Sequence, residues 1–411
     1  MMYAFTNANL FDGLNPQLQA NKTVFIEADR ITGVADGGAQ TDGFEVIDCT
    51  GKTVMPGLID THVHVYASQV NLSDNDSRPL TYVSQHAHKT LGRMLRRGFT
   101  TVRDCGGAEH GIAMALDDGL VVGPRLLYAG KILSQTGGHG DLRHPQRGSH
   151  DDDMCWTCGC SHVGHISVCV DGVDNIRRVV RENFRRGASF IKFAASGGVS
   201  SPTGSVTAMQ YSDEEVSAIV DEAERHERYC TAHIHPDIAI RRAIDLGVHC
   251  IEHATLIESD TARMAAEAGT HIVPTLSIAF SLLEEGESMG LAPASLDKLK
   301  VVVEGMMKSL GYLRDAGVTL AYGTDLLGQF ERHQCREFSY RSEVFSTVQL
   351  IQQATVNAAR VIGMAGEVGE ISPGTFADLL VVDGNPLDDI SLLQNDGHNL
   401  QIIMKSGEIV A

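Results

Sequence analysis

The chain has 411 residues, of which 43% are hydrophobic and 21% charged, a composition typical of globular proteins. Its 33 basic and 52 acidic residues give a net charge of −19, which argues against nucleic acid or an anionic membrane as a partner. No apolar run approaches the ~18 residues that span a bilayer. The first residues lack the basic and apolar regions of a secretory signal, so we expect a cytoplasmic protein.

Both ends of the chain contain short segments typical of β-strands. Near the N-terminus they cover 23–27, 30–34 and 45–48, and near the C-terminus 377–382 and 400–405. The long segment between the two ends has a different character. We therefore predict a small β-sandwich domain made from residues 1–57 plus 366–411, with a separate domain over 58–365.

The middle of the chain repeats one pattern, in which a helical segment ends at a glycine and a short apolar strand follows. Glycine just past a helix supplies the left-handed residue that ends it. The pattern recurs at Gly98, Gly187, Gly247, Gly269 and Gly317, and the last of these predicts a strand over 318–322. Ser212 with Glu215 also predicts a capping box at the start of one helix. Repeated helix–strand units with apolar strands indicate an α/β fold whose parallel sheet is covered by helices. A (β/α)₈ TIM barrel and an open, doubly wound sheet both satisfy this pattern.

Potential metal ligands stand at the ends of several of these strands. The segment VMPGLIDTHVHV contains His62 and His64, which point to the same side of an extended strand. Other strands end near Lys192, His233, His253 and Asp325. In a barrel these residues would share the C-terminal rim, where active sites are built. One histidine at a strand end is more often structural, but so many in one position indicate a common site.

Lys192 is unusual because it ends an apolar run, where a buried ammonium group is costly unless it is paired or neutralised. Carboxylation by CO₂ would convert this lysine into a carboxylate that can bridge two metal ions. The sequence therefore indicates a modified lysine in the same site.

This set of residues, in this order, resembles that of the amidohydrolase superfamily. The likeness extends over the whole chain and includes PGLIDTHVH, the TTVRDCGG segment at 100–107, SGG at 196–198, GTD at 323–325 and the C-terminal GTFADLLVVDGNP. The resemblance implies the (β/α)₈ barrel rather than the open sheet. It also implies that His62, His64 and Asp325 bind one divalent ion, that His233 and His253 bind a second, and that carboxylated Lys192 bridges both.

The resemblance implies a mechanism as well. Nitrogen and oxygen ligands suit zinc, and a hydroxide that bridges the two ions would attack the scissile carbonyl. Asp325 would be the catalytic residue that accepts the proton of the nucleophile and passes it to the leaving nitrogen.

Within the superfamily, the segments ILSQTGGHGD, FIKFAASGGVSSPTG and YGTDLLG look like those of Xaa-Pro dipeptidases and related metallocarboxypeptidases. The resemblance implies a homo-oligomer that removes the C-terminal residue from dipeptides or N-acyl amino acids. His139 and Arg143 are candidates to bind the substrate carboxylate. The subgroup usually carries Tyr where this chain has His235, and a phenol and an imidazole place their donors differently, so the substrate range is open.

Two other functions remain possible from the sequence alone. The substrate could be a cyclic or non-peptide amide, or the chain could be an inactive scaffold, although all six ligand positions are filled. The segment HDDDMCWTCGCSH at 150–162 also has two interpretations. Its Cys155, Cys158 and Cys160 could hold a structural zinc, or it could be an active-site loop in which Trp156 borders the substrate.

Overall fold

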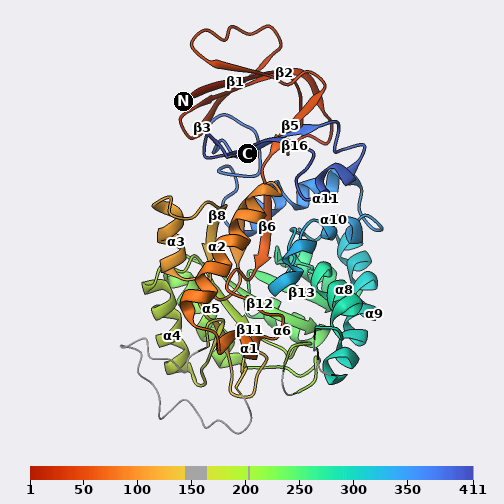
Figure 1. Cartoon of the computed structure of the whole chain (residues 1–411). Coiled ribbons are helices and arrows are strands. Elements are labelled where there is room, and N and C mark those ends of the chain that lie inside the picture. Colours follow the sequence, from red (N-terminus) through yellow and green to blue (C-terminus); the bar gives the residue numbers. More distant parts are fainter. Residues whose placement is uncertain (144–163, 202–203, 290, 292, 411) are drawn as a thin grey trace.

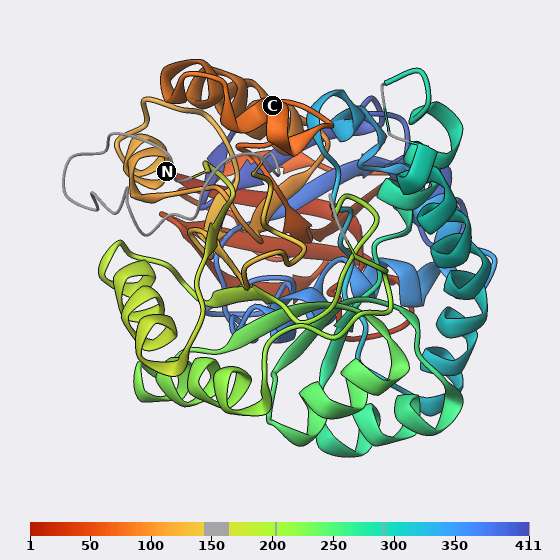
Figure 2. The ribbon, with the colours of Figure 1, turned by 90° about the horizontal axis from the view of Figure 1, so that it is seen from below.

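The computed structural model describes residues 1–143, 164–201, 204–289, 291 and 293–410. Figure 1 shows a sheet near both chain ends, standing on a larger part in which helices surround strands. Seen from below, helices ring the strands of this larger part (Figure 2).

The sheet near the chain ends has eight strands and draws on both termini. These strands are β1 (Met2–Leu10), β2 (Gln19–Glu27), β3 (Arg30–Asp36), β4 (Glu45–Asp48), β5 (Lys52–Pro56), β15 (Leu379–Asp383), β16 (Leu400–Lys405) and β17 (Glu408–Ile409). The two ends meet where β5 pairs with β15, antiparallel, and with β1, parallel. Both ends of the chain therefore share one sheet, while the sandwich and its boundaries at 1–57 and 366–411 stay predictions.

The larger part contains two parallel sheets. The first consists of β6 (Leu58–Val63), β7 (Phe99–Asp104) and β8 (Arg125–Tyr128). The second has the order β10-β9-β11-β12-β13-β14. Its strands are β9 (Ile132–Ser134), β10 (Ser167–Cys169), β11 (Ile191–Ala194), β12 (Cys230–Pro236), β13 (Cys250–Leu256) and β14 (His271–Val273).

Backbone hydrogen bonds connect the two parallel sheets on both sides. On one side, Ser189 N–H donates to the carbonyl of Tyr128, the last residue of β8, at 2.8 Å. On the other side, Thr61 N–H of β6 donates to the carbonyl of Tyr322 at 2.9 Å. Tyr322 ends the apolar segment 318–322, which we expected to be a strand. This segment forms only an isolated bridge to β14, between Ile272 and Leu320. These connections favour the barrel interpretation over an open sheet.

Helices follow most of the parallel strands along the chain. They are α1 (Leu72–Asp76), α2 (Leu80–Arg96), α3 (His110–Asp117), α4 (Val173–Arg185), α5 (Asp213–Arg225), α6 (Asp237–Asp245), α7 (Ser259–Ala268), α8 (Leu276–Glu285), α9 (Pro293–Ala316), α10 (Arg336–Arg341), α11 (Thr347–Gln353) and α12 (Val356–Val361). The glycines predicted to end helices all have positive φ, between 71° and 89°. The predicted capping box of α5 is also present, because Ser212 and Glu215 each bond the other's backbone N–H. In the described part of the chain, no helix is both long and apolar enough to cross a membrane.

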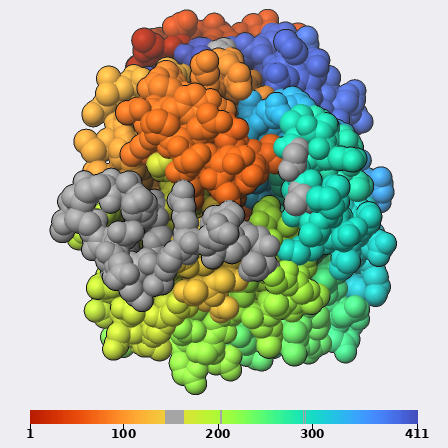
Figure 3. Space-filling model, turned by 60° about the horizontal axis from the view of Figure 1, so that its bottom comes forward, coloured from red at the N-terminus to blue at the C-terminus, as the bar shows by residue number. Residues whose placement is uncertain are grey.

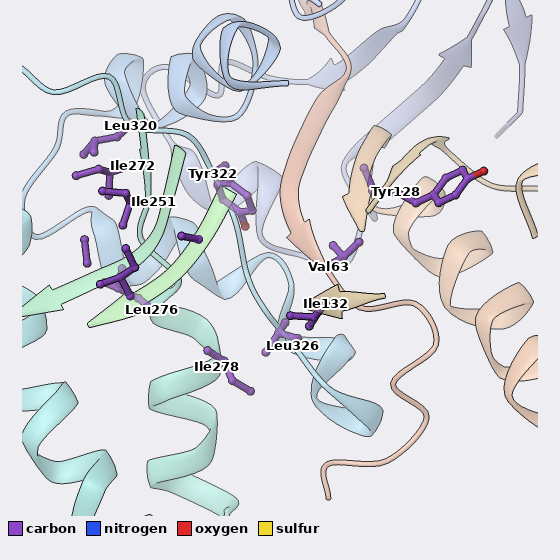
Figure 4. Close-up of a cluster of buried hydrophobic side chains, with 14 of the residues drawn as sticks. Val63, Tyr128, Ile132, Ile251, Ile272, Leu276, Ile278, Leu320, Tyr322 and Leu326 are labelled. Atoms are coloured by element: carbon purple, nitrogen blue, oxygen red, sulfur yellow. The ribbon is translucent and has the colours of Figure 1, made fainter. Parts of the chain in front are cut away.

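Apolar side chains from strands and helices fill the space between the elements. Figure 4 shows part of this cluster, with Val63 and Ile251 on strands and Leu276 and Ile278 on α8. Burial of each such side chain stabilises the folded state by about 1.5–3 kcal/mol. The polar side chains buried at the strand ends therefore differ from the apolar interior around them.

Candidate metal centre

A cavity lies at the C-terminal ends of the parallel strands, and the six predicted metal ligands all line it: His62, His64, Lys192, His233, His253 and Asp325. The Oδ1 atom of Asp325 lies 3.3 Å from Nε2 of His62 and 3.1 Å from Nε2 of His64. Ligand atoms of His62, His253 and Asp325 lie within 4.8 Å of one another, so the two predicted groups of ligands adjoin each other. The structure therefore brings together side chains that are up to 263 residues apart in sequence, from His62 to Asp325.

The imidazole rings of the site contact one another in sequence across the cavity. The rings of His62 and His253 are 5.2 Å apart, and those of His233 and His253 are 4.5 Å apart. On the far side, His139 stacks on His233 with ring centroids at 3.9 Å. The imidazoles of the site therefore form one continuous group of neighbouring rings.

Lys192 lies in β11 beside these rings and is almost completely buried. Its Nζ has no hydrogen-bond partner among the described residues. An unpartnered buried ammonium is costly. A carboxylated lysine that binds two cations would remove this cost, so the residues present fit a binuclear site.

The backbone is strained at two of the predicted ligands. His253 has a φ of 75° and Asp325 a φ of 54°, in the left-handed region that residues other than glycine rarely adopt. Such strain costs about 1–3 kcal/mol each and concentrates at functional sites, where the surrounding structure holds it in place.

Burial and neighbouring charges set the protonation of the site. Burial and adjacent positive groups hold the pKa of His233 and of His253 well below the usual histidine value. Burial also opposes ionisation of Asp325, but the nearby His62 and His64 outweigh it and keep its pKa well below the usual range. Neutral imidazoles and an ionised carboxylate are the forms that bind metal ions.

Two buried carboxylates that we did not predict support this group from behind. Glu252 accepts from Nδ1 of His62 at 2.7 Å and pairs with Arg103, with Nη2 and Oε1 2.7 Å apart. Asp60 accepts hydrogen bonds from Thr324 and Gln334 next to the Asp325 loop. The signal for Glu252 was present in the sequence, since a charged residue interrupts the apolar segment CIEHA, as Lys192 interrupts its own strand.

The predicted substrate-binding residues have different positions. His139 and His235 line the cavity, where their imidazoles bond the hydroxyls of Ser201 at 2.9 Å and Thr255 at 2.8 Å. Arg143 is not among the described residues that line it and pairs with Asp141, with Nη2 and Oδ2 2.6 Å apart. Its binding of a substrate carboxylate stays a prediction. The Cys155, Cys158 and Cys160 segment, with Trp156, lies outside the described residues.

One wall of the cavity is apolar and comes from two helices. Ile278 and Leu282 of α8 face Leu299, Val302 and Met306 of α9 across this part of the cavity. All of them are almost completely buried. Figure 4 shows Ile278 with Leu276 at the start of α8, and Figure 3 shows the surface of α8 and α9 beside that of α1 and α2.

Comparison with known proteins identifies this arrangement. The sequence profile described as "Amidohydrolase family" matches residues 53–410. The chain belongs to the amidohydrolase family. Membership implies an α/β fold that contains a TIM barrel, and amidohydrolases generally use divalent metal ions. The family is therefore consistent with the donor set found in the cavity.

Relatives within the family include hydrolases of amides. Ochratoxinase of Aspergillus niger is 34% identical over 352 residues, which cover 83% of this chain and 72% of the relative. A crystal structure of an amidohydrolase is 43% identical with a TM-score of 0.96, covering 100% of this chain and 99% of the other. A prolidase bound to N-methylphosphonate-L-proline is 40% identical with a TM-score of 0.95 and the same coverage. These similarities support metal-dependent amide hydrolysis in general.

Proposed function

We propose that this protein is a binuclear metal-dependent hydrolase that cleaves the C-terminal amide bond of dipeptides or N-acyl amino acids. The observation that carries the proposal is the convergence of Lys192, Asp325 and four imidazoles on one cavity. The similarity to a prolidase with a bound proline phosphonate supports a substrate whose C-terminal residue is an amino acid.

Each side chain of the site has a role in this proposal. His62, His64 and Asp325 would hold one divalent ion and His233 and His253 the other, and carboxylated Lys192 would be a ligand of both; the nitrogen and oxygen ligands suit zinc. When bound, divalent ions would supply Lewis-acid chemistry, which lowers the pKa of a nearby water and polarises the scissile carbonyl. Asp325 would take the proton of this water and give it to the leaving nitrogen, so that the amide and the water become a carboxylic acid and an amine.

Different parts of the cavity lining would contact the polar and the apolar parts of the substrate. Among the described lining residues Lys192 is the only lysine or arginine, so a substrate carboxylate would depend on hydrogen bonds from groups such as His139 and His235. Burial lowers the pKa of His139 to about 4 and of His235 to about 3, so both are neutral donors or acceptors near pH 7. We place an apolar side chain of the substrate against the wall formed by α8 and α9.

A second candidate substrate is a non-peptide amide. The name of ochratoxinase points to ochratoxin as its substrate rather than to a dipeptide, and this relative covers most of the chain. The apolar wall would accept such a molecule equally well. Both candidates use the same metal centre and differ only in what lies on either side of the scissile bond.

Measuring kcat/KM for a dipeptide library, N-acyl amino acids, cyclic amides and other non-peptide amides separates these candidates. We expect the highest values for substrates with a free C-terminal carboxylate and a large apolar side chain. Failure to cleave any dipeptide or N-acyl amino acid, together with cleavage of cyclic amides, would contradict the proposal.

A variant of the apolar wall tests the placement of the substrate. Leu282→Ala should lower kcat/KM by roughly tenfold or more for substrates with large apolar side chains, and much less for those with alanine, because contact area is lost only for the former. Leu283→Ala is the matched control, since the neighbouring Leu283 is 48% exposed and does not line the cavity. Equal losses for large and small substrates would place the side chain elsewhere.

A further inference from the structure

A buried ion pair lies directly behind His62, on the side away from the cavity. Glu252 Oε2 is 2.7 Å from Nδ1 of His62, and its Oε1 is 2.7 Å from Nη2 of Arg103. Thr231 Oγ1 donates to the same Oε1. All four side chains are almost completely excluded from solvent, with Arg103 and Glu252 at 0% exposure.

The other imidazoles of the site have neutral partners. Nδ1 of His64 bonds the carbonyl of Gly106 at 2.8 Å, and Nδ1 of His253 bonds the hydroxyl of Thr275 at 2.6 Å. Among the hydrogen bonds of the described residues, His62 is thus the one predicted ligand whose rear nitrogen meets a carboxylate. This difference distinguishes the ion near His62 and Asp325 from the ion near His233 and His253.

We propose that Glu252 is a positioning residue for His62, and that the Arg103–Glu252 pair makes the ion held by His62 the more tightly bound of the two. The inference rests on the proposed binuclear centre. A proton on Nδ1, held by the carboxylate, leaves the lone pair of Nε2 directed at the cavity and at Asp325. A carboxylate behind a ligating imidazole fixes its tautomer and orientation and raises its basicity, which strengthens the bond to a metal ion.

Arg103 allows Glu252 to remain charged in this interior. An isolated buried carboxylate would become neutral, because its desolvation is too costly. Arg103 also donates through Nε to the carbonyl of Thr61, one residue before His62, at 2.5 Å. The same guanidinium therefore fixes both the backbone of β6 beside the ligand and the carboxylate behind it.

Competition between the chain and a chelator for Zn²⁺ tests this inference without any substrate. Glu252→Gln alone leaves Arg103 buried without its partner, which destabilises strongly, so the charges are removed together. In R103M/E252Q the amide oxygen can still accept from His62, and in R103M/E252L it cannot. Circular dichroism and the melting temperature of the metal-free variants establish that each one folds.

We expect R103M/E252Q to bind its tighter Zn²⁺ equivalent about 10–100-fold more weakly than wild type, because changes to the partner of a metal-binding histidine have effects of this size. R103M/E252L should bind this equivalent more weakly still. In both variants the affinity for the other equivalent should stay within threefold of wild type. Thr275→Val is the matched control, because it removes a neutral partner from His253; it should affect only the other equivalent, by a smaller factor. Unchanged affinities in folded R103M/E252L, or equal losses at both equivalents, would overturn the inference. A protein that binds Zn²⁺ as described but cleaves no amide would contradict the proposed function alone.

Discussion

Two groups of histidines occupy opposite ends of the same strands and differ in what surrounds them. At the C-terminal end of β13, His253 lies among the other imidazoles, with Lys192 and Asp325 in the same cavity. At the N-terminal end, His249 precedes β13 and contacts His271 of β14, with ring centroids 4.8 Å apart. Arg103 lowers the pKa of both histidines of this second pair, and no carboxylate of the described residues is among the groups that shift them.

The two groups of histidines differ in the charges that act on them. The carboxylate of Asp325 outweighs burial and raises the pKa of His64, because it favours positive charge at that position. Burial, His249 and Arg103 instead lower the pKa of His271 to about 4. An anion that converges with the imidazoles is therefore the feature that separates the candidate metal centre from an ordinary buried pair.

Removal of that anion should have the largest effect. Asp325→Asn should reduce kcat by about 10²–10⁴-fold, because both the proton acceptor and one metal ligand are lost. Steady-state kinetics with the best amide substrate measures this loss, and Asp237→Asn at the same rim, outside the cavity, is the control. Activity of Asp325→Asn close to that of wild type would show that Asp325 transfers no proton.

The proposed bridging role of Lys192 predicts the next largest effect. Lys192→Ala should lower the metal content of the purified chain, and short carboxylic acids should restore part of it by replacing the bridging carboxylate. Elemental analysis measures the metal per chain. Lys298→Ala is the matched control, because its ammonium already donates to the carbonyl of Ser201 at 3.0 Å. Wild-type metal content in Lys192→Ala would contradict the bridge.

The histidines at the opposite strand ends predict the smallest effect, on stability alone. His271 has a pKa of about 4 in the folded chain and 6.5 in the reference state. Below pH 6.5 the unfolded chain therefore binds a proton that the folded chain does not, and stability falls until about pH 4. His271→Asn removes this contribution, so its melting temperature should fall less than that of wild type between pH 6.5 and 4, each relative to its value at pH 8. Parallel curves would show that His271 does not titrate in this way.

Local signals in the sequence predicted much of the fold. The glycines after helices, the capping box at Ser212 and the strands 45–48 and 400–405 depend on neighbours within a few residues, and all appear in the structure. Segment 318–322 was less predictable. Its apolar run gives no information about partners, and Tyr322 N–H bonds the carbonyl of Gln353 rather than a neighbouring strand.

The site was predictable where its residues lie at strand ends, because parallel strands bring those ends to one rim. The partners of these residues depend on contacts between distant segments. Spacing could not reveal that Arg103 and Glu252, 149 residues apart, would pair behind His62. Nor could it reveal that α8 and α9 would supply an apolar wall.

A crystal structure of the Zn²⁺-loaded chain with anomalous scattering tests the central claim most directly. We expect two anomalous peaks in the cavity, one contacted by His62, His64 and Asp325 and the other by His233 and His253, with density for a carboxylated Lys192 between them. Peaks only outside this cavity, or an unmodified Lys192 that contacts neither ion, would contradict the account.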